Sequence, residues 1–199
     1  MIDFENNLPP RKILLFWIPL ALTWLMMALE GPIVASVIAR LQEAKLNLAA
    51  YGVALSVAFI SEGPIIMLVS TATALVRDYS SYRKLLRFAV VLNSLITVLL
   101  AILMIPQVFS FLADEVVGLP EEVSHLAYWS TLLFLPWPAA IGIRRFYQGI
   151  LIRHNRTRFV TYGTIIRLGS LTASVFLLSL WESLPGACVG SLSLSVGVV

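Results

Sequence analysis

The chain has 199 residues, of which 59% are hydrophobic and 13% are charged, and its net charge is +3. Together with a mean hydropathy of +0.89, this composition excludes an ordinary soluble domain and is typical of an integral membrane protein. The basic residues fall in short clusters between apolar segments and form no continuous stripe. The charge therefore indicates membrane topology and not nucleic-acid binding.

The chain begins with a polar segment, residues 1–12, that ends in Pro9-Pro10-Arg11-Lys12. A secretory signal peptide is the alternative interpretation of this start, but its apolar region should last only about 7 to 15 residues. The apolar run that follows is longer and extends from Ile13 to Ala39. We therefore interpret residues 1–12 as a cytoplasmic N-terminus and residues 13–199 as a transmembrane lobe.

Five apolar segments are long enough to cross a bilayer, which requires about 20 residues in a helix. A sixth begins near Pro185 and is shorter, so we expect it to be truncated and the chain to be the front part of a longer protein. The predicted spans are residues 13–39, 48–76, 88–112, 126–152 and 159–181, followed by the incomplete span 185–199. The sequence thus predicts an all-α fold, a polytopic bundle of membrane helices that contacts the lipid bilayer.

The connections between the spans alternate in charge. The basic loops follow the second and fourth spans and contain Arg77, Arg83, Lys84 and Arg87, and Arg153, Arg156 and Arg158. The remaining loops contain Asp114, Glu115, Glu121, Glu122 and Glu182, apart from a mixed first loop with Arg40, Glu43 and Lys45. By the positive-inside rule the basic loops and the N-terminus are cytoplasmic. We expect a multi-pass protein of the plasma or inner membrane.

Two spans contain the same interruption, Glu30-Gly31-Pro32 in the first and Glu62-Gly63-Pro64 in the second. In hydrocarbon an acid needs a partner or water, and each backbone group freed by a proline needs a hydrogen bond. Broken helices near the midplane are typical of transporter binding sites. We expect helix breaks at both Gly-Pro pairs and, in the fourth span, near Pro136 and Pro138.

Three arginines also lie inside the spans, Arg144 and Arg145 in the fourth and Arg167 in the fifth. A helical rise of about 1.5 Å per residue puts Glu30 and Glu62 roughly 25 and 21 Å from the cytoplasmic ends of their spans, and the arginines roughly 11 to 12 Å. The sequence therefore predicts an acidic layer near the midplane and a basic layer about 10 Å nearer the cytoplasm.

These intramembrane charges have a structural and a functional interpretation. In the structural one, the glutamates are protonated or hydrogen-bonded packing residues, one of the adjacent arginines extends to the headgroups, and Arg167 forms a salt bridge or carbonyl contacts with the fourth span. In the functional one, Glu30 and Glu62 bind a cation or exchange protons. Arg144, Arg145 and Arg167 then attract an anionic small-molecule substrate.

The remaining signals are weak. His125 and His154 are isolated from other metal-ligating residues, and no nucleophile and base stand at a usable spacing, so we expect neither a metal site nor an enzyme. The only cofactor expected is a coupling ion, H⁺ or Na⁺. Cys188 is predicted to be a small buried residue, and Gly186 to Gly190 fits close helix packing. The glycosylation sequon at Asn155 should be idle because its loop is predicted to be cytoplasmic.

Three stretches of the chain together carry a family pattern. They are Trp17-Ile-Pro19 in the first span, Leu48-Ala-Ala-Tyr51-Gly52 and Glu62-Gly63-Pro64 in the second, and Leu135-Pro136-Trp-Pro138 through Arg144 to Gln148-Gly149 and Arg153-His154 in the fourth. This pattern resembles the progressive ankylosis protein family. It is more distantly similar to the multidrug and toxin extrusion (MATE) transporters and lipid-linked oligosaccharide flippases of the same MOP superfamily.

The resemblance implies an efflux transporter that works by alternating access, built from two six-helix lobes with a cavity between them. This chain would supply the N-terminal lobe, and a second lobe would lie downstream. The resemblance further implies small anionic substrates such as pyrophosphate, citrate or nucleotides. In the drug-extruding relatives an acid of the first span couples ion to substrate, and Glu30 occupies a broadly similar place; Arg144 and Arg167 fit the progressive ankylosis pattern. A lipid flippase, a cation or drug antiporter and a non-functional fragment remain alternatives.

Overall fold

The computed structural model describes residues 9–181 and 184–198, and in this part of the chain every regular element is a helix. The protein is an all-α membrane helix bundle, as the sequence predicts. Four helices are long and apolar enough to cross a membrane, or five if one bent pair counts as a single span. The elements are α1 (Pro10–Ile38), α2 (Ala44–Ile66), α3 (Leu68–Leu75), α4 (Tyr79–Leu103), α5 (Pro106–Ser110), the π-helix η1 (Phe111–Val116), α6 (Glu121–Leu132), α7 (Trp137–Arg153), α8 (Thr157–Ser179) and α9 (Gly186–Val198). The predictions for residues 1–8, Glu182 and Val199 lie outside the described residues.

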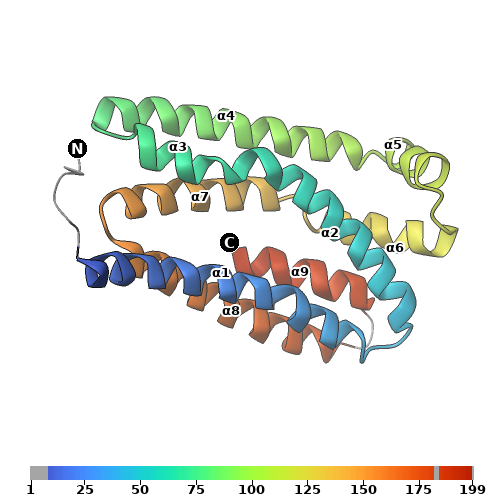
Figure 1. Ribbon diagram of the computed structural model, residues 1–199. Helices are drawn as coiled ribbons and strands as arrows, with labels where there is room; N and C mark the ends of the chain where they lie inside the picture. Colours follow the sequence, from blue (N-terminus) through green and yellow to red (C-terminus); the bar gives the residue numbers. More distant parts are fainter. Residues whose placement is uncertain (1–8, 182–183, 199) are drawn as a thin grey trace.

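The long helices run side by side (Figure 1). The start of α1 and the α3–α4 and α7–α8 turns lie at one end of the bundle, and the α1–α2 turn and the α5–η1 segment lie at the other. Helices α1 and α8 pack together as one layer, which we call the α1–α8 layer. Helices α2, α3 and α7 form a second layer, the α2–α7 layer, with α4 on its outer side and α9 against both layers.

Helix α1 is continuous through Gly31-Pro32, which corrects the break expected there. It runs without interruption from Pro10 to Ile38, with both Pro19 and Pro32 inside it. A proline removes one backbone hydrogen bond and crowds the preceding turn. In a membrane, however, no water competes for the other backbone groups, so the neighbouring bonds hold the helix together.

The second span is interrupted near its predicted position but not at the Gly-Pro pair itself. Gly63 and Pro64 lie inside α2, and the interruption falls at Met67, between α2 and α3. The Met67 carbonyl accepts hydrogen bonds from the hydroxyls of Ser70 and Thr71 at 2.9 and 2.8 Å. The Thr71 backbone N–H donates to the same carbonyl at 3.0 Å, so it stays paired across the interruption. Helices α2 and α3 together form one apolar span of 32 residues.

The third span, predicted at residues 88–112, instead occupies α4, residues 79–103. It starts earlier because the Asp78 carboxylate accepts a hydrogen bond from the Ser81 backbone N–H at 2.7 Å and caps the helix. It ends earlier because Pro106 and the extended residue before it cannot continue a helix. Arg83, Lys84 and Arg87 therefore lie on the first turns of α4, not in a loop.

The fourth span is bent by 46° between α6 and α7. Pro136 stands at the N-cap of α7 and Pro138 lies in its first turn, where a proline costs least because the N–H groups have no helical partner. The carbonyl of Leu133, at the bend, accepts a hydrogen bond from the Ser195 hydroxyl at 2.7 Å. The break expected near these prolines is present, and α9 helps to satisfy it.

The sixth apolar segment forms the 13-residue helix α9, which is buried among its neighbours. A Cβ atom added at Gly190 would lie 2.8 Å from Ile38 and 2.9 Å from the Tyr51 ring, so glycine permits the close helix contact expected from the sequence. The Asn47 amide oxygen accepts a hydrogen bond from the Ala187 N–H at 2.9 Å and fixes the start of α9 against α2. Cys188 is buried, as predicted.

Candidate functional site

Both intramembrane glutamates form ion pairs with intramembrane arginines. Glu30 on α1 accepts a hydrogen bond from Arg167 on α8 at 2.6 Å, and Glu62 on α2 accepts one from Arg145 on α7 at 2.8 Å. All four side chains are at most 11% exposed. No other ion pair within 4.0 Å occurs among residues 9–181 and 184–198.

This pairing corrects the prediction of separate acidic and basic layers. The depths estimated from the helical rise refer to the backbone, whereas long arginine side chains reach along the helix axis to meet a carboxylate. Arg167 also pairs with the first span rather than with the fourth. Its contact with the fourth span is a cation–π interaction, with the guanidinium 5.6 Å from the centre of the Trp137 ring.

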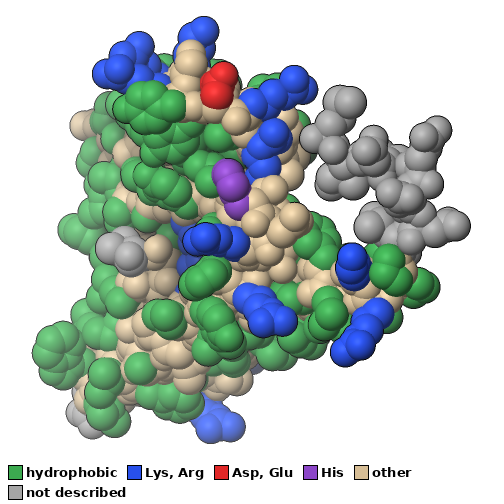
Figure 2. Space-filling model, turned by 90° about the vertical axis from the view of Figure 1, so that its left-hand side faces the viewer, with side chains coloured by type: hydrophobic (Ala, Val, Ile, Leu, Met, Phe, Trp, Pro, Cys, Tyr) green, Lys and Arg blue, Asp and Glu red, His purple; other side chains and the backbone are tan. Residues whose placement is uncertain are grey.

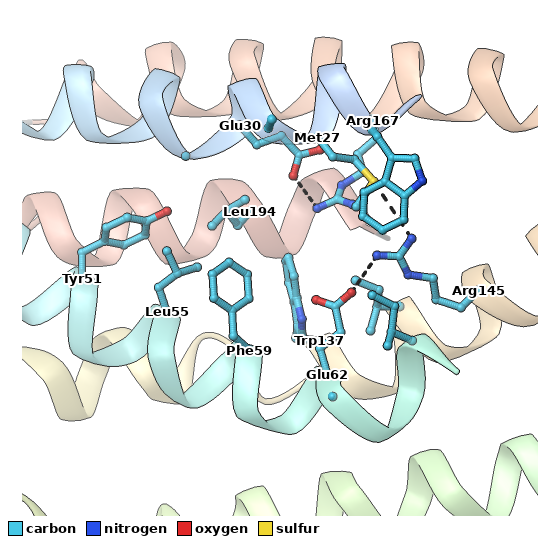
Figure 3. A pocket seen from close by; sticks show the side chains of 16 residues that line it. Met27, Glu30, Tyr51, Leu55, Phe59, Glu62, Trp137, Arg145, Arg167 and Leu194 are labelled. Atoms are coloured by element: carbon cyan, nitrogen blue, oxygen red, sulfur yellow. Dashed lines mark hydrogen bonds and ion pairs between the residues drawn. The ribbon is translucent and has the colours of Figure 1, made fainter. Parts of the chain in front are cut away.

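The two ion pairs face a single cavity of about 380 Å³ between the α1–α8 and α2–α7 layers (Figure 3). Glu30, Glu62, Arg145 and Arg167 all line it, together with Leu194 from α9. The structure therefore brings four of the five predicted site residues into one cavity, although they come from four different helices. The lining is mostly apolar, and the four charged side chains in it are buried.

Arg144 does not line this cavity. Its Nη2 donates to the Gly163 carbonyl at 3.4 Å and to the Thr164 hydroxyl at 3.3 Å, both on α8. Adjacent residues on a helix point about 100° apart, so Arg144 turns toward α8 while Arg145 turns into the cavity. We assign Arg144 a role in holding α7 and α8 together.

Sequence reasoning missed the aromatic residues of the site. Trp24, Tyr51, Phe59 and Trp137 line the cavity, and Figure 3 shows the Tyr51, Phe59 and Trp137 side chains among those around it. Aromatic residues are common in membrane helices, where most face lipid. Tyr51 and Trp137 differ because each is buried and carries a polar atom, but burial does not show in a sequence of apolar runs.

The arrangement combines two positive and two negative charges, so the paired site is electrically neutral. Several polar atoms in it have no hydrogen-bond partner among the described residues: Glu30 Oε1, Tyr51 OH, Trp137 Nε1, Arg145 Nε and Arg167 Nε. Buried polar atoms are nearly always paired with protein, water or ligand. Four of these five atoms are donors, so the buried side chains around the cavity carry more unpaired donors than unpaired acceptors.

The position of Arg145 gives the site a further property. Its Nη1 lies 3.4 Å from the Gln148 amide oxygen and 4.0 Å from the Met27 sulfur. Met27 belongs to α1 and Gln148 to α7. Arg145 thus contacts both layers, and it retains partial hydrogen bonding if Glu62 is withdrawn.

Comparisons with known proteins add no relative: no family model, no curated protein and no solved structure matches the chain. Within the described ranges, no group of three or more His, Cys, Asp or Glu side chains is placed to hold a metal ion. The function of the chain is therefore inferred from the geometry of the cavity.

Proposed function

We propose that the chain is one lobe of a secondary active transporter that moves a small anion by alternating access. The observation that carries this proposal is the pair of buried Glu–Arg contacts that face one cavity inside a membrane helix bundle. Ionisable residues in membrane helices are costly and mark substrate and ion pathways. Four such residues around one cavity indicate a site that handles charge.

The ion pairs suggest how binding would be coupled to protons. While Glu62 is ionised it is paired with the Arg145 guanidinium, so an incoming anion must compete with the Glu62 carboxylate for this arginine. Protonation of Glu62 removes its charge and releases Arg145 for a carboxylate or phosphate group. The same logic applies to Glu30 and Arg167. The anion and the proton would bind together, and each protonated glutamate would offset one negative charge of the bound anion.

The proposal also includes the orientation and a second lobe. The end of the bundle that carries the α3–α4 and α7–α8 turns is rich in Lys and Arg (Figure 2), and the positive-inside rule makes it the cytoplasmic end. The cavity is bordered by exposed apolar side chains of α1 and α2, such as Trp24 and Phe59. A second lobe encoded downstream would cover this side and complete the pathway.

Transport measurements test the proposal. In cells that express the chain from its native genomic locus, so that any downstream lobe is present, efflux of labelled citrate, pyrophosphate and ATP would be followed at imposed pH gradients. Arg145→Gln should lower the rate of the transported anion by at least about tenfold. Arg40→Gln, an exposed change in the α1–α2 turn, is the matched control. Unchanged transport by the Arg145 variant would refute the role of the cavity.

A lipid-linked substrate is the second candidate. Trp24 and Phe59 line the cavity and are also 60% and 59% exposed, so the cavity reaches an apolar face of the bundle. A lipid with a diphosphate headgroup could enter there and place its phosphates on Arg145 and Arg167. Competition distinguishes the two functions: a water-soluble pyrophosphate should inhibit an anion transporter at its site, while a flippase should respond only to the lipid-linked compound.

A further inference from the structure

A second concave region lies at the basic end of the bundle, apart from the central cavity. One hollow of about 710 Å³ lies between the starts of α1 and α8 and is lined by Lys12, Arg156 and Arg158. A neighbouring hollow of about 560 Å³ is lined by Arg77 and Arg153. Phe16 and Asn155 line both, so the two hollows adjoin. We call them together the basic groove.

The positive charges of the basic groove have no acidic partner in the described part of the chain. Its five cations appear in neither of the two ion pairs found there. Asp78, next to Arg77 in sequence, instead uses its carboxylate to cap α4. Figure 2 shows this end of the bundle, where Lys and Arg side chains spread over the surface and acidic side chains are sparse. Such a concentration of charge favours an anionic ligand.

The donors of the groove differ in how firmly they are held. Arg153 Nη1 donates to the Thr73 and Ala74 carbonyls at 2.7 and 3.2 Å, which fixes its guanidinium between α7 and the end of α3. The side chains of Lys12, Arg156 and Arg158 are exposed and make no hydrogen bond to a described residue. The three exposed side chains are free to donate hydrogen bonds to a phosphate from several directions, next to the fixed Arg153.

The start of α8 adds to this field. The helix has 23 residues and begins at Thr157, and no side chain caps its first turn. The free N–H groups of a helix start carry partial positive charge and favour anions. Because Arg156 and Arg158 flank the same turn, the positive charge of the helix start and of these side chains falls in the same hollow.

Part of the lining of the basic groove is apolar, which favours a lipid over a soluble anion as its ligand. Ile13, Leu15, Phe16 and Phe159 line the first hollow, and all four are exposed on the bundle. Phe16 lies four residues, or about 6 Å, along α1 from Lys12. The cations thus lie at the helix ends, at the level of lipid headgroups. Ile13 and Phe159 follow Lys12 and Arg158 directly, and Phe16 lies one turn deeper, so the apolar side chains begin beside the cations and extend toward the level of the acyl chains.

We propose that the basic groove is a binding site for an anionic phospholipid, with the phosphate held by Lys12, Arg156 and Arg158 and the acyl chains lying along Phe16 and Phe159. This site is separate from the central cavity and does not depend on the transport proposal. A bound lipid would join the starts of α1 and α8, the two helices of the α1–α8 layer.

Lipid binding can be measured on the purified chain. Detergent-solubilised protein would be titrated with phosphatidylglycerol and with phosphatidylcholine of the same acyl chains, and bound lipid counted by native mass spectrometry. We expect the wild type to prefer phosphatidylglycerol by about tenfold. The triple variant Lys12→Gln/Arg156→Gln/Arg158→Gln should bind both lipids within about twofold of each other. Its changes are exposed, so folding should be preserved, which the unfolding temperature in lipid-free detergent would verify.

The matched control is Arg40→Gln/Lys45→Gln, which removes exposed basic charge at the opposite end of the bundle. It should keep the wild-type preference. Equal binding of the two lipids by the wild type, or an unchanged preference in the triple variant, would overturn the proposal. A loss as large in the control would also overturn it, because general surface charge would then explain binding. Glycerol 3-phosphate should compete poorly; displacement of the lipid at equal concentration would overturn the lipid assignment and mean a site for soluble phosphate instead.

Discussion

The two Glu–Arg pairs look alike in sequence but hold different parts of the bundle. Glu30 and Arg167 join the two helices of the α1–α8 layer, whereas Glu62 and Arg145 join two helices of the α2–α7 layer. Each pair thus lies within one layer, and the cavity lies between the layers. A relative movement of the two layers would therefore leave both ion pairs intact.

The two layers also differ in how they are anchored. Helix α1 buries only Thr23, Glu30, Val34, Val37 and Ile38 over 29 residues, and it packs mainly against the single helix α8. Helix α2 buries seven residues over 23 and packs against α6, α7 and α9. We therefore expect the same chemical change to destabilise the bundle more at Glu30 than at Glu62.

The largest expected effect follows from breaking the pair in the α1–α8 layer. Arg167→Gln leaves the Glu30 carboxylate buried without its counter-charge and removes the cation–π contact with Trp137. It should lower the free energy of unfolding by about 3–5 kcal/mol. The measurement is unfolding of the purified protein by titration of mixed micelles with SDS. The double variant Glu30→Gln/Arg167→Gln should recover much of the loss, since no lone charge remains; a double variant as unstable as the single one would contradict this account.

A smaller loss is expected in the α2–α7 layer. Glu62→Gln leaves Arg145 near the Gln148 amide oxygen, and the amide introduced by the substitution can still accept one of the arginine's hydrogen bonds. We expect a loss of about 2–3 kcal/mol in the same SDS titration. Arg145, the partner of Glu62, contacts both layers. Under conditions in which both variants are equally folded, Glu62→Gln should therefore lower the transport rate more than Glu30→Gln does. A Glu62 variant less stable than the Glu30 variant would reverse the comparison.

The sequence predicted the charges better than it predicted their partners. Its apolar runs identified the membrane helices, and the intramembrane charges identified four of the residues that line the cavity. The pairing of Glu30 with Arg167, which are 137 positions apart, depends on how α1 and α8 pack. That packing is set by side-chain shape over the whole length of both helices, and no local signal encodes it.

The Gly-Pro pairs show why a local rule failed. In water, proline breaks or kinks a helix because it removes one hydrogen bond, its ring crowds the preceding turn, and the freed carbonyl can bond to water instead. At Pro32 the helix continues, since the membrane offers no such alternative. The bend occurs near Pro136, where the Ser195 hydroxyl donates a hydrogen bond to the freed carbonyl of Leu133. Whether a helix bends at a proline thus depends here on a hydroxyl group from α9, and the sequence of the fourth span alone does not indicate this partner.

Two glycine substitutions, one in each layer, compare how tightly the layers are packed without changing any charge. A Cβ atom added at Gly149 of α7 would lie 2.5 Å from the Val69 carbonyl oxygen and 2.6 Å from the Ala72 Cβ, so a backbone must move. Gly149→Ala should cost about 1–2 kcal/mol of unfolding free energy. Gly169→Ala on α8, where nothing lies within 4 Å, is the control and should be neutral or slightly stabilising. A loss at Gly149 no larger than the loss at Gly169 would contradict the close packing of α7 against α3.

The smallest effect concerns α4, which covers only the α2–α7 layer. The Ser81 backbone N–H and hydroxyl groups hydrogen-bond Asp78 and hold the pKa of its exposed carboxyl below its ordinary value. Since the folded pKa is lowered, ionised Asp78 stabilises the start of α4 above the ordinary value of 3.8, and this contribution is lost as the pH falls through the folded pKa. Amide hydrogen exchange in the first turn of α4 should therefore gain protection as the pH rises through this range, relative to Asp78→Asn, which caps the helix without titrating. The start of α8 has no such side-chain cap, so the same measurement there should show no difference between the two proteins. A parallel change at both sites would mean that the acid-dependent step is a general loosening of the bundle and not the release of this cap.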